Sequence, residues 1–210
     1  MQIEPHYVSS LVIENPVFMR QVLTAFHFQL SGNDGPLVVS DESVPINISK
    51  VVEYLDVFIP FEINRKSLLS KVISRMESQT VESDYVFKGN MLLGEIESYL
   101  DELSLDLPCS IDYPKLTWNS LIKAVSPIIL YDGDSLADQI LQYMELISDL
   151  EGDKVFVLVG LRTVMDDPEL SLFIKTATQH QYLVLLIDAI SRPVLPLEHR
   201  LTIDYDLCEF

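Results

Sequence analysis

The residue of greatest chemical interest is Asp188, which ends the apolar run "YLVLLIDAI" between Tyr182 and Ile190. In nucleotide hydrolases, an acid at the end of such a strand helps to hold Mg²⁺ beside the phosphates. The alternative role is structural, because an aspartate at a strand end often caps the turn that follows. The run therefore raises two hypotheses for Asp188, a metal ligand in nucleotide chemistry and a turn-capping acid.

A nucleotide site also needs a phosphate-binding loop, in which glycines, a lysine and a hydroxyl residue stand at the start of a helix. The nearest match is "GNMLLGEI", where Gly89 and Gly94 have the required spacing but Glu95 occupies the lysine position. A carboxylate there would repel phosphate, and the segment has a helical pattern with no strand before it. The sequence therefore argues against ATP hydrolysis. A degenerate hydrolase that still uses Asp188 and a metal is the enzyme alternative.

Motifs for nucleophilic catalysis are absent from the sequence. The four histidines stand at unrelated positions, and neither GxSxG nor HExxH occurs. Cys109 and Cys208 have no partner at metal-ligand spacing. We expect them to be buried thiols in a reducing compartment, although one disulfide between them is conceivable. No catalytic residue is predicted.

A basic cluster is the first feature that suggests binding. Arg65, Lys66, Lys71 and Arg75 fall within eleven residues that contain no acid. Lys71 and Arg75 are four positions apart, so both project from one side of the expected helix. Contact with phosphates needs positive charge at suitable spacing and no base-reading group. The cluster predicts contact with a nucleic-acid backbone, and the alternative is an ordinary solvated helix face.

An acid-rich segment is the second such feature. Asp101, Glu102, Asp106 and Asp112 lie at the end of an expected helix and in the loop after it. Carboxylates in this arrangement suit a hard cation such as Ca²⁺, although no EF-hand pattern is present. Calcium binding and plain solvation are the two interpretations of the segment.

The elements that must position these residues follow from the hydrophobic periodicity. Residues 154–160 and 182–187 read as buried strands around a helix that Asp167 caps, which predicts a right-handed parallel crossover. In the middle of the chain, Asn64 is expected to cap a helix that runs to about residue 77. The other predicted strands are 7–13, 37–39, 51–57, 106–111 and 201–205, and the other predicted helices are 17–28, 85–103, 116–125 and 135–150.

These elements predict an α/β fold with a helical insertion. Residues 1–62 and 151–210 form a head around a parallel or mixed sheet. Residues 63–150 form a mainly helical leg, with a short strand near residues 106–111.

Composition limits the range of functions. The net charge of −18 argues against a general nucleic-acid coat protein, which would be basic, and favours cation binding or association. The apolar runs are too short to cross a bilayer, and the N-terminus lacks the pattern of a signal peptide. We therefore expect a soluble, cytoplasmic protein.

The order of the motifs resembles a known family, the CRISPR-associated adaptation protein of type II-A systems, which forms DNA-end-binding rings in spacer acquisition. "VIENPVFMRQVLTAF" is similar to the first strand and helix of that family. "VVEYLDVFIPFEINRKSLLSKVISRME" is similar to its strand, turn and long helix, and "ELSLDLPCSID" to its short strand beside the leg. "KVFVLVGLRTVMDDPELSLFI" followed by "YLVLLI" resembles its closing crossover. The resemblance covers nearly the whole chain.

The resemblance implies a head built like a degenerate P-loop hydrolase without a working nucleotide site, in which Asp188 is a relic or a structural acid. It also implies a homotetrameric ring with a basic hole and bound calcium, for which Glu102, Asp106 and Asp112 are the expected ligands. DNA would be held by its backbone without sequence choice. By position, Arg20 joins Arg65, Lys66, Lys71 and Arg75 as an expected DNA contact.

The function expected from the resemblance is therefore non-catalytic binding of double-stranded DNA ends in spacer acquisition. The expected partners are other CRISPR adaptation proteins and the effector nuclease. Two alternatives remain, the degenerate nucleotide-binding hydrolase and a pure protein-interaction adaptor.

Overall fold

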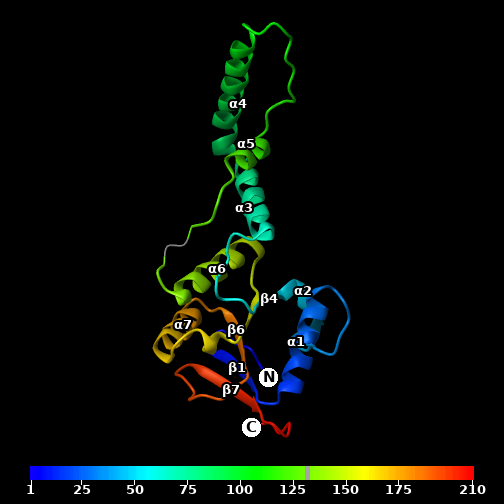
Figure 1. Cartoon of the computed structure of the whole chain (residues 1–210), viewed down its shortest axis with the longest axis vertical. Coiled ribbons are helices and arrows are strands. Elements are labelled where there is room, and N and C mark those ends of the chain that lie inside the picture. Colours follow the sequence, from blue (N-terminus) through cyan, green and yellow to red (C-terminus); the bar gives the residue numbers. More distant parts are fainter. Residues whose placement is uncertain (131–132) are drawn as a thin grey trace. The chain divides into compact units, whose positions relative to one another are not determined.

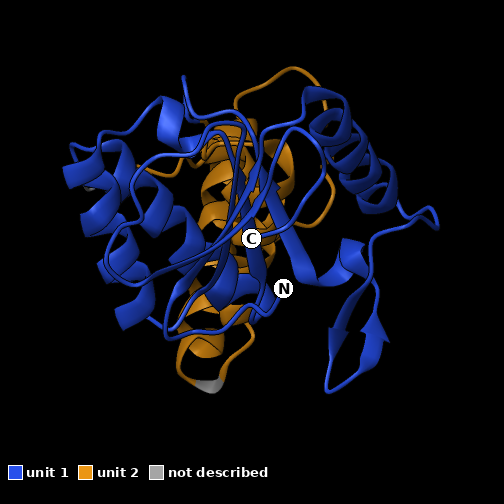
Figure 2. Ribbon diagram, turned by 90° about the horizontal axis from the view of Figure 1, so that it is seen from below, with its two compact units in different colours: residues 1–61, 131–210 blue, residues 62–130 orange. Residues whose placement is uncertain are grey.

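Two compact units make up the chain. The computed structural model describes residues 1–130 and 133–210, with only the backbone at Ser83. The α/β unit contains residues 1–61 and 131–210, and the helical unit contains residues 62–130 (Figure 2). The first boundary agrees with the predicted one. The second lies at residue 130 instead of 150, because the apolar face of the helix before residue 151 packs on the α/β unit.

A five-stranded sheet, parallel throughout, is the centre of the α/β unit, which confirms the predicted fold class. The strand order is β4-β5-β6-β1-β7, so β1 lies between β6 and β7. Val12 is level with Asp188 on β6, and Val8 is level with Glu198 on β7. The strands are β1 (Val8–Ile13), β4 (Val52–Leu55), β5 (Val155–Val159), β6 (Leu183–Asp188) and β7 (Glu198–Ile203).

Helices cover both faces of this sheet, as a parallel sheet requires. α6 and α7 lie together on one side, and α1 and α2 lie on the other (Figure 1). α6 faces inward because Ile140, Met144 and Ile147 recur at helical spacing and are buried. The helices are α1 (Pro16–Leu30), α2 (Ile48–Val51), α6 (Leu136–Glu151), the short 3₁₀ helix η1 (Leu161–Thr163) and α7 (Asp167–Gln179).

Several details of the α/β unit differ from the prediction, which also gave a strand at residues 51–57 where the structure has α2 followed by β4. The cap of α7 is Asp166, not Asp167, because the Asp166 side chain accepts the Glu169 N–H at 2.9 Å. β7 begins at Glu198, three residues before the predicted start. The charged residues at its start do not look like part of a strand in the sequence, because their burial depends on ion pairs. The strand predicted at residues 37–39 lies instead at β2 (Val39–Asp41), which forms an unpredicted hairpin with β3 (Val44–Ile46).

The helical unit consists of α3 (Lys66–Gln79), α4 (Ser83–Ser104) and α5 (Trp118–Val125). The predicted strand at residues 106–111 is wrong, since this segment forms turns and bends. The chain after α4 is fixed by side-chain contacts instead of strand pairing, because the Tyr113 hydroxyl donates to the Glu97 carbonyl at 3.1 Å.

Asn64 does not cap α3 as predicted. Its side chain donates to the Ile129 carbonyl at 3.0 Å and accepts the Ile129 N–H at 2.7 Å. The Asn64 amide therefore joins the two chain ends of the helical unit. Its partner, Ile129, is distant in sequence, so a local sequence pattern could not indicate this contact.

None of the described helices is long and apolar enough to cross a membrane.

Candidate nucleic-acid interface

The predicted DNA-contacting residues are divided between the two units. Arg20 lies on α1 and is exposed. Lys66, Lys71 and Arg75 are exposed on α3, and Arg65 is half-buried at its N-terminal end. The structure thus places four of the five cations on one helix, and the fifth in the α/β unit.

The start of α3 carries an unusual charge arrangement. Arg65 is the N-cap residue and makes no side-chain cap hydrogen bond, and the first turn contains no acid. Lys66 follows at the first helical position. A helix N-terminus is the positive end of its dipole, so two cations there are unfavourable for the helix and favourable for a bound anion.

The remaining residues of α3 preserve this positive character. Its one acid, Glu77, accepts a hydrogen bond from the Asn119 side chain of α5 at 2.6 Å. At the start of the helix, Arg65 Nε donates to the Glu62 carbonyl at 3.2 Å, which orients the guanidinium. α3 therefore offers side-chain positive charge from its N-terminal end to Arg75.

The predicted metal ligands are not brought together within one chain. Among the described residues, no three His, Cys, Asp or Glu side chains gather closely enough to hold a metal ion. Glu102, Asp106 and Asp112 are all exposed. Asp101 accepts a hydrogen bond from the Tyr113 hydroxyl, and this bond, with burial and nearby acids, raises the pKa of Tyr113 to about 12. Within the described residues of one chain, the three predicted ligands therefore do not form a calcium site.

The place where a phosphate loop would stand is the junction between β1 and α1, because the helix begins directly after a central strand. Only Glu14 and Asn15 separate the two elements. The side-chain Oδ1 of Asn15 accepts the N–H groups of Val17 and Phe18 at 3.0 and 3.1 Å. The first-turn donors are thus partly occupied, and no glycine or lysine is present.

The "GNMLLGEI" segment has a different role from the one first considered. It lies inside α4, and a Cβ added at Gly89 would stand 2.9 Å from Trp118 Nε1, whereas one at Gly94 would meet nothing within 4 Å. Gly89 therefore allows the indole ring of Trp118 to lie directly on the helix. The spacing of the two glycines is unrelated to phosphate binding.

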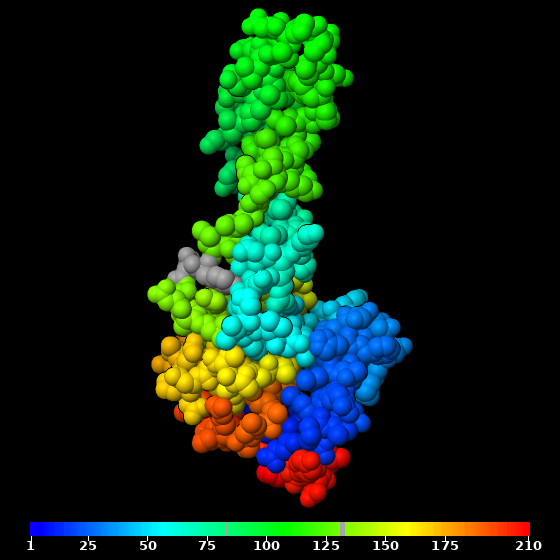
Figure 3. All heavy atoms as spheres, in the orientation of Figure 1, coloured from blue at the N-terminus to red at the C-terminus, as the bar shows by residue number. Residues whose placement is uncertain are grey.

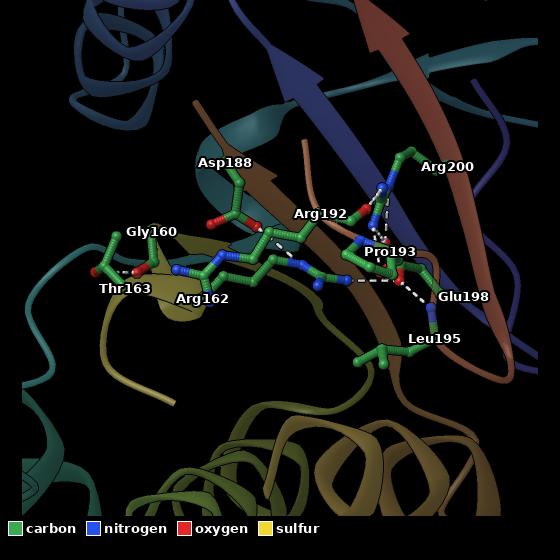
Figure 4. A network of polar contacts seen from close by, with 9 residues as sticks. All are labelled: Gly160, Arg162, Thr163, Asp188, Arg192, Pro193, Leu195, Glu198 and Arg200. Atoms are coloured by element: carbon green, nitrogen blue, oxygen red, sulfur yellow. Dashed lines mark hydrogen bonds and ion pairs between the residues drawn. The ribbon is translucent and has the colours of Figure 1, made fainter. Parts of the chain in front are cut away.

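Asp188 belongs to a buried ionic network on one face of the sheet (Figure 4). Its Oδ2 lies 3.7 Å from Nε of Arg162, which follows β5. Arg162 Nη2 then donates to Glu198 Oε2 at 2.5 Å, and Arg200 Nη2 donates to Glu198 Oε1 at 2.7 Å. Asp188 therefore takes part in a buried ion pair instead of the predicted turn cap.

The two acids of the network have opposite pKa shifts. Burial raises the pKa of Asp188 above 3.8, and the charge and backbone N–H of Arg162 offset this only in part. Burial acts in the same direction on Glu198, but hydrogen bonds from Leu195 and Arg200 and the charge of Arg162 outweigh it and lower the pKa. The two arginines thus stabilise Glu198 as a carboxylate more fully than Asp188.

Arg162, Glu198 and Arg200 were not predicted from the sequence. The available signal was the presence of charged residues inside apolar patterns, "GLRT" after β5 and "EHRLTI" in β7. The expectation of buried thiols is also wrong, since Cys109 and Cys208 are both exposed and unpaired with each other.

Comparison with known proteins gives a family match. The model of a family described as CRISPR-associated protein (Cas_Csn2) matches residues 29–207. No curated protein sequence matches the chain.

Two solved structures are similar to this one. A crystal structure of Stu0660 of Streptococcus thermophilus is 13% identical, with a TM-score of 0.54, over 91% of this chain and 65% of that chain. The chain thus spans about two thirds of the length of that protein. A putative ABC transporter ATP-binding protein from Pyrococcus furiosus is 15% identical, with a TM-score of 0.40, over 95% of this chain and 86% of that chain. At these identities, the first similarity shows the fold alone.

Proposed function

Because the chain belongs to the CRISPR-associated Csn2 family, we propose that it binds the ends of double-stranded DNA, without catalysis, during spacer acquisition. The observation that carries the proposal is the family match, to which the exposed cations of α3 add a surface suited to phosphate. The protein acts in the cytoplasm, together with other adaptation proteins and the effector nuclease of the CRISPR system.

The distribution of charge supports the helical unit as the main DNA contact. This unit contains half of the Lys and Arg residues of the chain in about a third of its length, and under a third of the acids. The α/β unit carries most of the net charge of −18, and Arg162 and Arg200 are already used in its interior. Phosphate contacts by α3 would fix DNA by its backbone and leave the base sequence unread.

A homotetrameric ring is the proposed assembly, because the helical unit does not bury its own apolar residues. Among its described large apolar side chains, only Ile63, Leu68 and Ile122 are buried. Figure 3 shows one face of this surface, with α4 and the following segment in green. Exposed apolar residues in that region include Phe87, Met91, Tyr99, Leu100, Leu103, Leu105, Leu107 and Ile111. An apolar surface of this extent is typical of an interface between subunits.

Light scattering tests the assembly directly. A tetramer at micromolar concentration is the expected result, whereas a monomer in both the presence and the absence of calcium would contradict the ring. Phe87→Ser and Met91→Ser together should reduce the assembled fraction, and Phe28→Ser, an exposed residue of α1, is the matched control.

Calcium is proposed to act only between subunits, since the described residues of one chain do not gather three acidic ligands. Carboxylates from two copies would be required, and Ca²⁺ tolerates such irregular oxygen sets better than Mg²⁺ does. A ligand that binds only the assembly raises its melting temperature. Equal melting temperatures with calcium and with chelator would contradict the proposal that calcium stabilises the assembly.

The absence of catalysis is supported by the β1–α1 junction and by the ion pair of Asp188 with Arg162. The rival hydrolase predicts heat release when ATP and Mg²⁺ are titrated into the protein, and we expect none. A second rival, a pure protein adaptor, predicts no retention of DNA at any salt concentration.

Gel-shift assays over a salt series test DNA binding. Affinity for a linear duplex should fall steeply as salt rises, because each neutralised phosphate releases counterions. Lys71→Glu and Arg75→Glu should weaken binding and flatten the salt dependence. Arg20→Glu tests the contribution of the α/β unit, and Lys175→Glu on α7 is a control with the same charge change. Affinity that does not depend on the cations of α3 would contradict the proposed interface.

A further inference from the structure

A pocket in the helical unit lies outside the cation surface of α3. It has a volume of about 370 Å³ and opens between the end of α3, the first half of α4 and the start of α5. Its lining includes Met76, Tyr85, Lys88, Leu92, Trp118 and Ile122. This volume is within the range of small-molecule sites, roughly 300–1,000 Å³.

Trp118 is placed in this pocket by the bare backbone of Gly89. The indole Nε1 would stand 2.9 Å from a Cβ at that position, so any larger residue would push the ring away from α4. The ring is half-buried, and Tyr85 on α4 is 57% exposed. The pocket therefore presents two aromatic side chains, one fixed by packing and one accessible.

Lys88 is the charged residue among the pocket's lining residues. It is exposed, and it forms no ion pair within the described part of the chain. An occupant with an apolar, planar part and a negative group next to it would match both the rings and the ammonium. An unpaired nucleobase with its phosphate has this chemistry, since every base stacks on aromatic rings.

We propose that this pocket holds an unpaired base at a frayed or tailed DNA end, with its phosphate on Lys88. The inference rests on the proposed DNA-binding function and adds to it a way to recognise an end. Backbone contacts by α3 are the same anywhere along a duplex, whereas an unpaired base is available only where the duplex stops. A protein side chain from a second copy is the competing occupant. If such a side chain fills the pocket, the addition of nucleic acid should not change the fluorescence of Trp118.

The fluorescence of Trp118 reports on the pocket, because it is the one tryptophan of the sequence. The probes are a short oligothymidylate, a blunt-ended duplex, and the same duplex with a single-stranded tail. We expect quenching of Trp118 by the oligothymidylate and by the tailed duplex, and about tenfold tighter binding of the tailed than of the blunt duplex. Tyr85→Ala and Lys88→Ala should remove this preference, and Lys175→Ala should keep it.

The outcomes separate this inference from the proposed function. Equal binding of both duplexes without quenching would overturn the pocket assignment and leave duplex binding intact. Quenching by oligothymidylate without any duplex binding would support the pocket and overturn the proposed function. Trp118 emission that changes only with protein concentration would overturn the assignment. It would indicate that the pocket is part of an interface between copies of the chain.

Discussion

At the scale of single residues, the buried network around Arg162 explains why an acid stands where a nucleotide hydrolase would hold a metal. Asp188 and Glu198 share Arg162, and Arg200 completes the partners of Glu198. Loss of one partner from a buried ion pair is strongly destabilising, because the remaining charge has no compensation. Asp188 thus has a structural reason to be present that is independent of nucleotide chemistry.

The raised pKa of Asp188 gives a pH prediction. The folded state takes up its proton at a higher pH than the unfolded state does, so this group adds stability as pH falls from its raised pKa to 3.8. Asp188→Asn removes this gain. Its free energy of unfolding should therefore fall more steeply than that of the wild type on acidification.

Urea unfolding at a series of pH values measures this difference. Glu198, whose pKa is lowered, loses stabilisation on acidification in both proteins, so the two pH profiles share this downward trend. Parallel pH profiles for the two proteins would show that Asp188 does not titrate differently in the folded state.

At the scale of elements, the contact between α4 and Trp118 gives a matched pair of substitutions. Gly89→Ala gains about 1 kcal/mol of helix propensity, but forcing the indole away from the helix costs about 1–3 kcal/mol, for a net loss of up to about 2 kcal/mol. Gly94→Ala meets nothing within 4 Å, so it should stabilise α4 by about 0.5–1 kcal/mol. Thermal unfolding followed by Trp118 emission measures both, and shifts of the same sign would contradict the packing role of Gly89.

At the start of α3, one substitution should raise the stability of the helical unit and lower its affinity for DNA. Arg65→Asp supplies the missing cap and a favourable charge at the helix dipole, which should stabilise the unit by about 1 kcal/mol. The same change places a negative charge where phosphate is expected, so DNA affinity should fall. Melting temperature and gel shifts measure the two effects. Unchanged DNA affinity would exclude the start of α3 from the interface.

The periodic elements could be predicted from sequence because their signals are local. The strands β1, β5 and β6 and the helix α7 follow from apolar runs and turn residues in the expected places. Features that depend on distant partners could not be predicted. Asn64 bonds to Ile129, sixty-five positions away, and local capping rules assign it to α3 instead. The segment 106–111 has apolar alternation but no neighbouring strand to pair with.

The candidate site was predictable only in part. The cations of α3 are visible as a run of charge, and the structure places them on one helix. The pocket beside Trp118 combines residues from three helices, which no local motif joins. The acids at residues 101–112 lie close together in sequence, but the described residues of one chain do not gather three of them around one point.

At the scale of the whole molecule, a ring would reconcile the acidic chain with DNA binding. The excess of acids repels a duplex from most of the surface, whereas several copies of α3 around one opening would concentrate the cations. The helical unit exposes the apolar residues that such an assembly would cover. Entry of DNA into a closed ring is then possible only from an end.

The most direct test of this account compares linear and closed-circular forms of one DNA sequence in a gel-shift assay with calcium. Both forms present the same phosphates, so they differ only in the presence of an end. The account predicts retention of the linear form and weak binding of the circle, and cleavage of the circle at one site should restore full binding. Equal binding of the two forms would contradict the ring and its recognition of DNA ends.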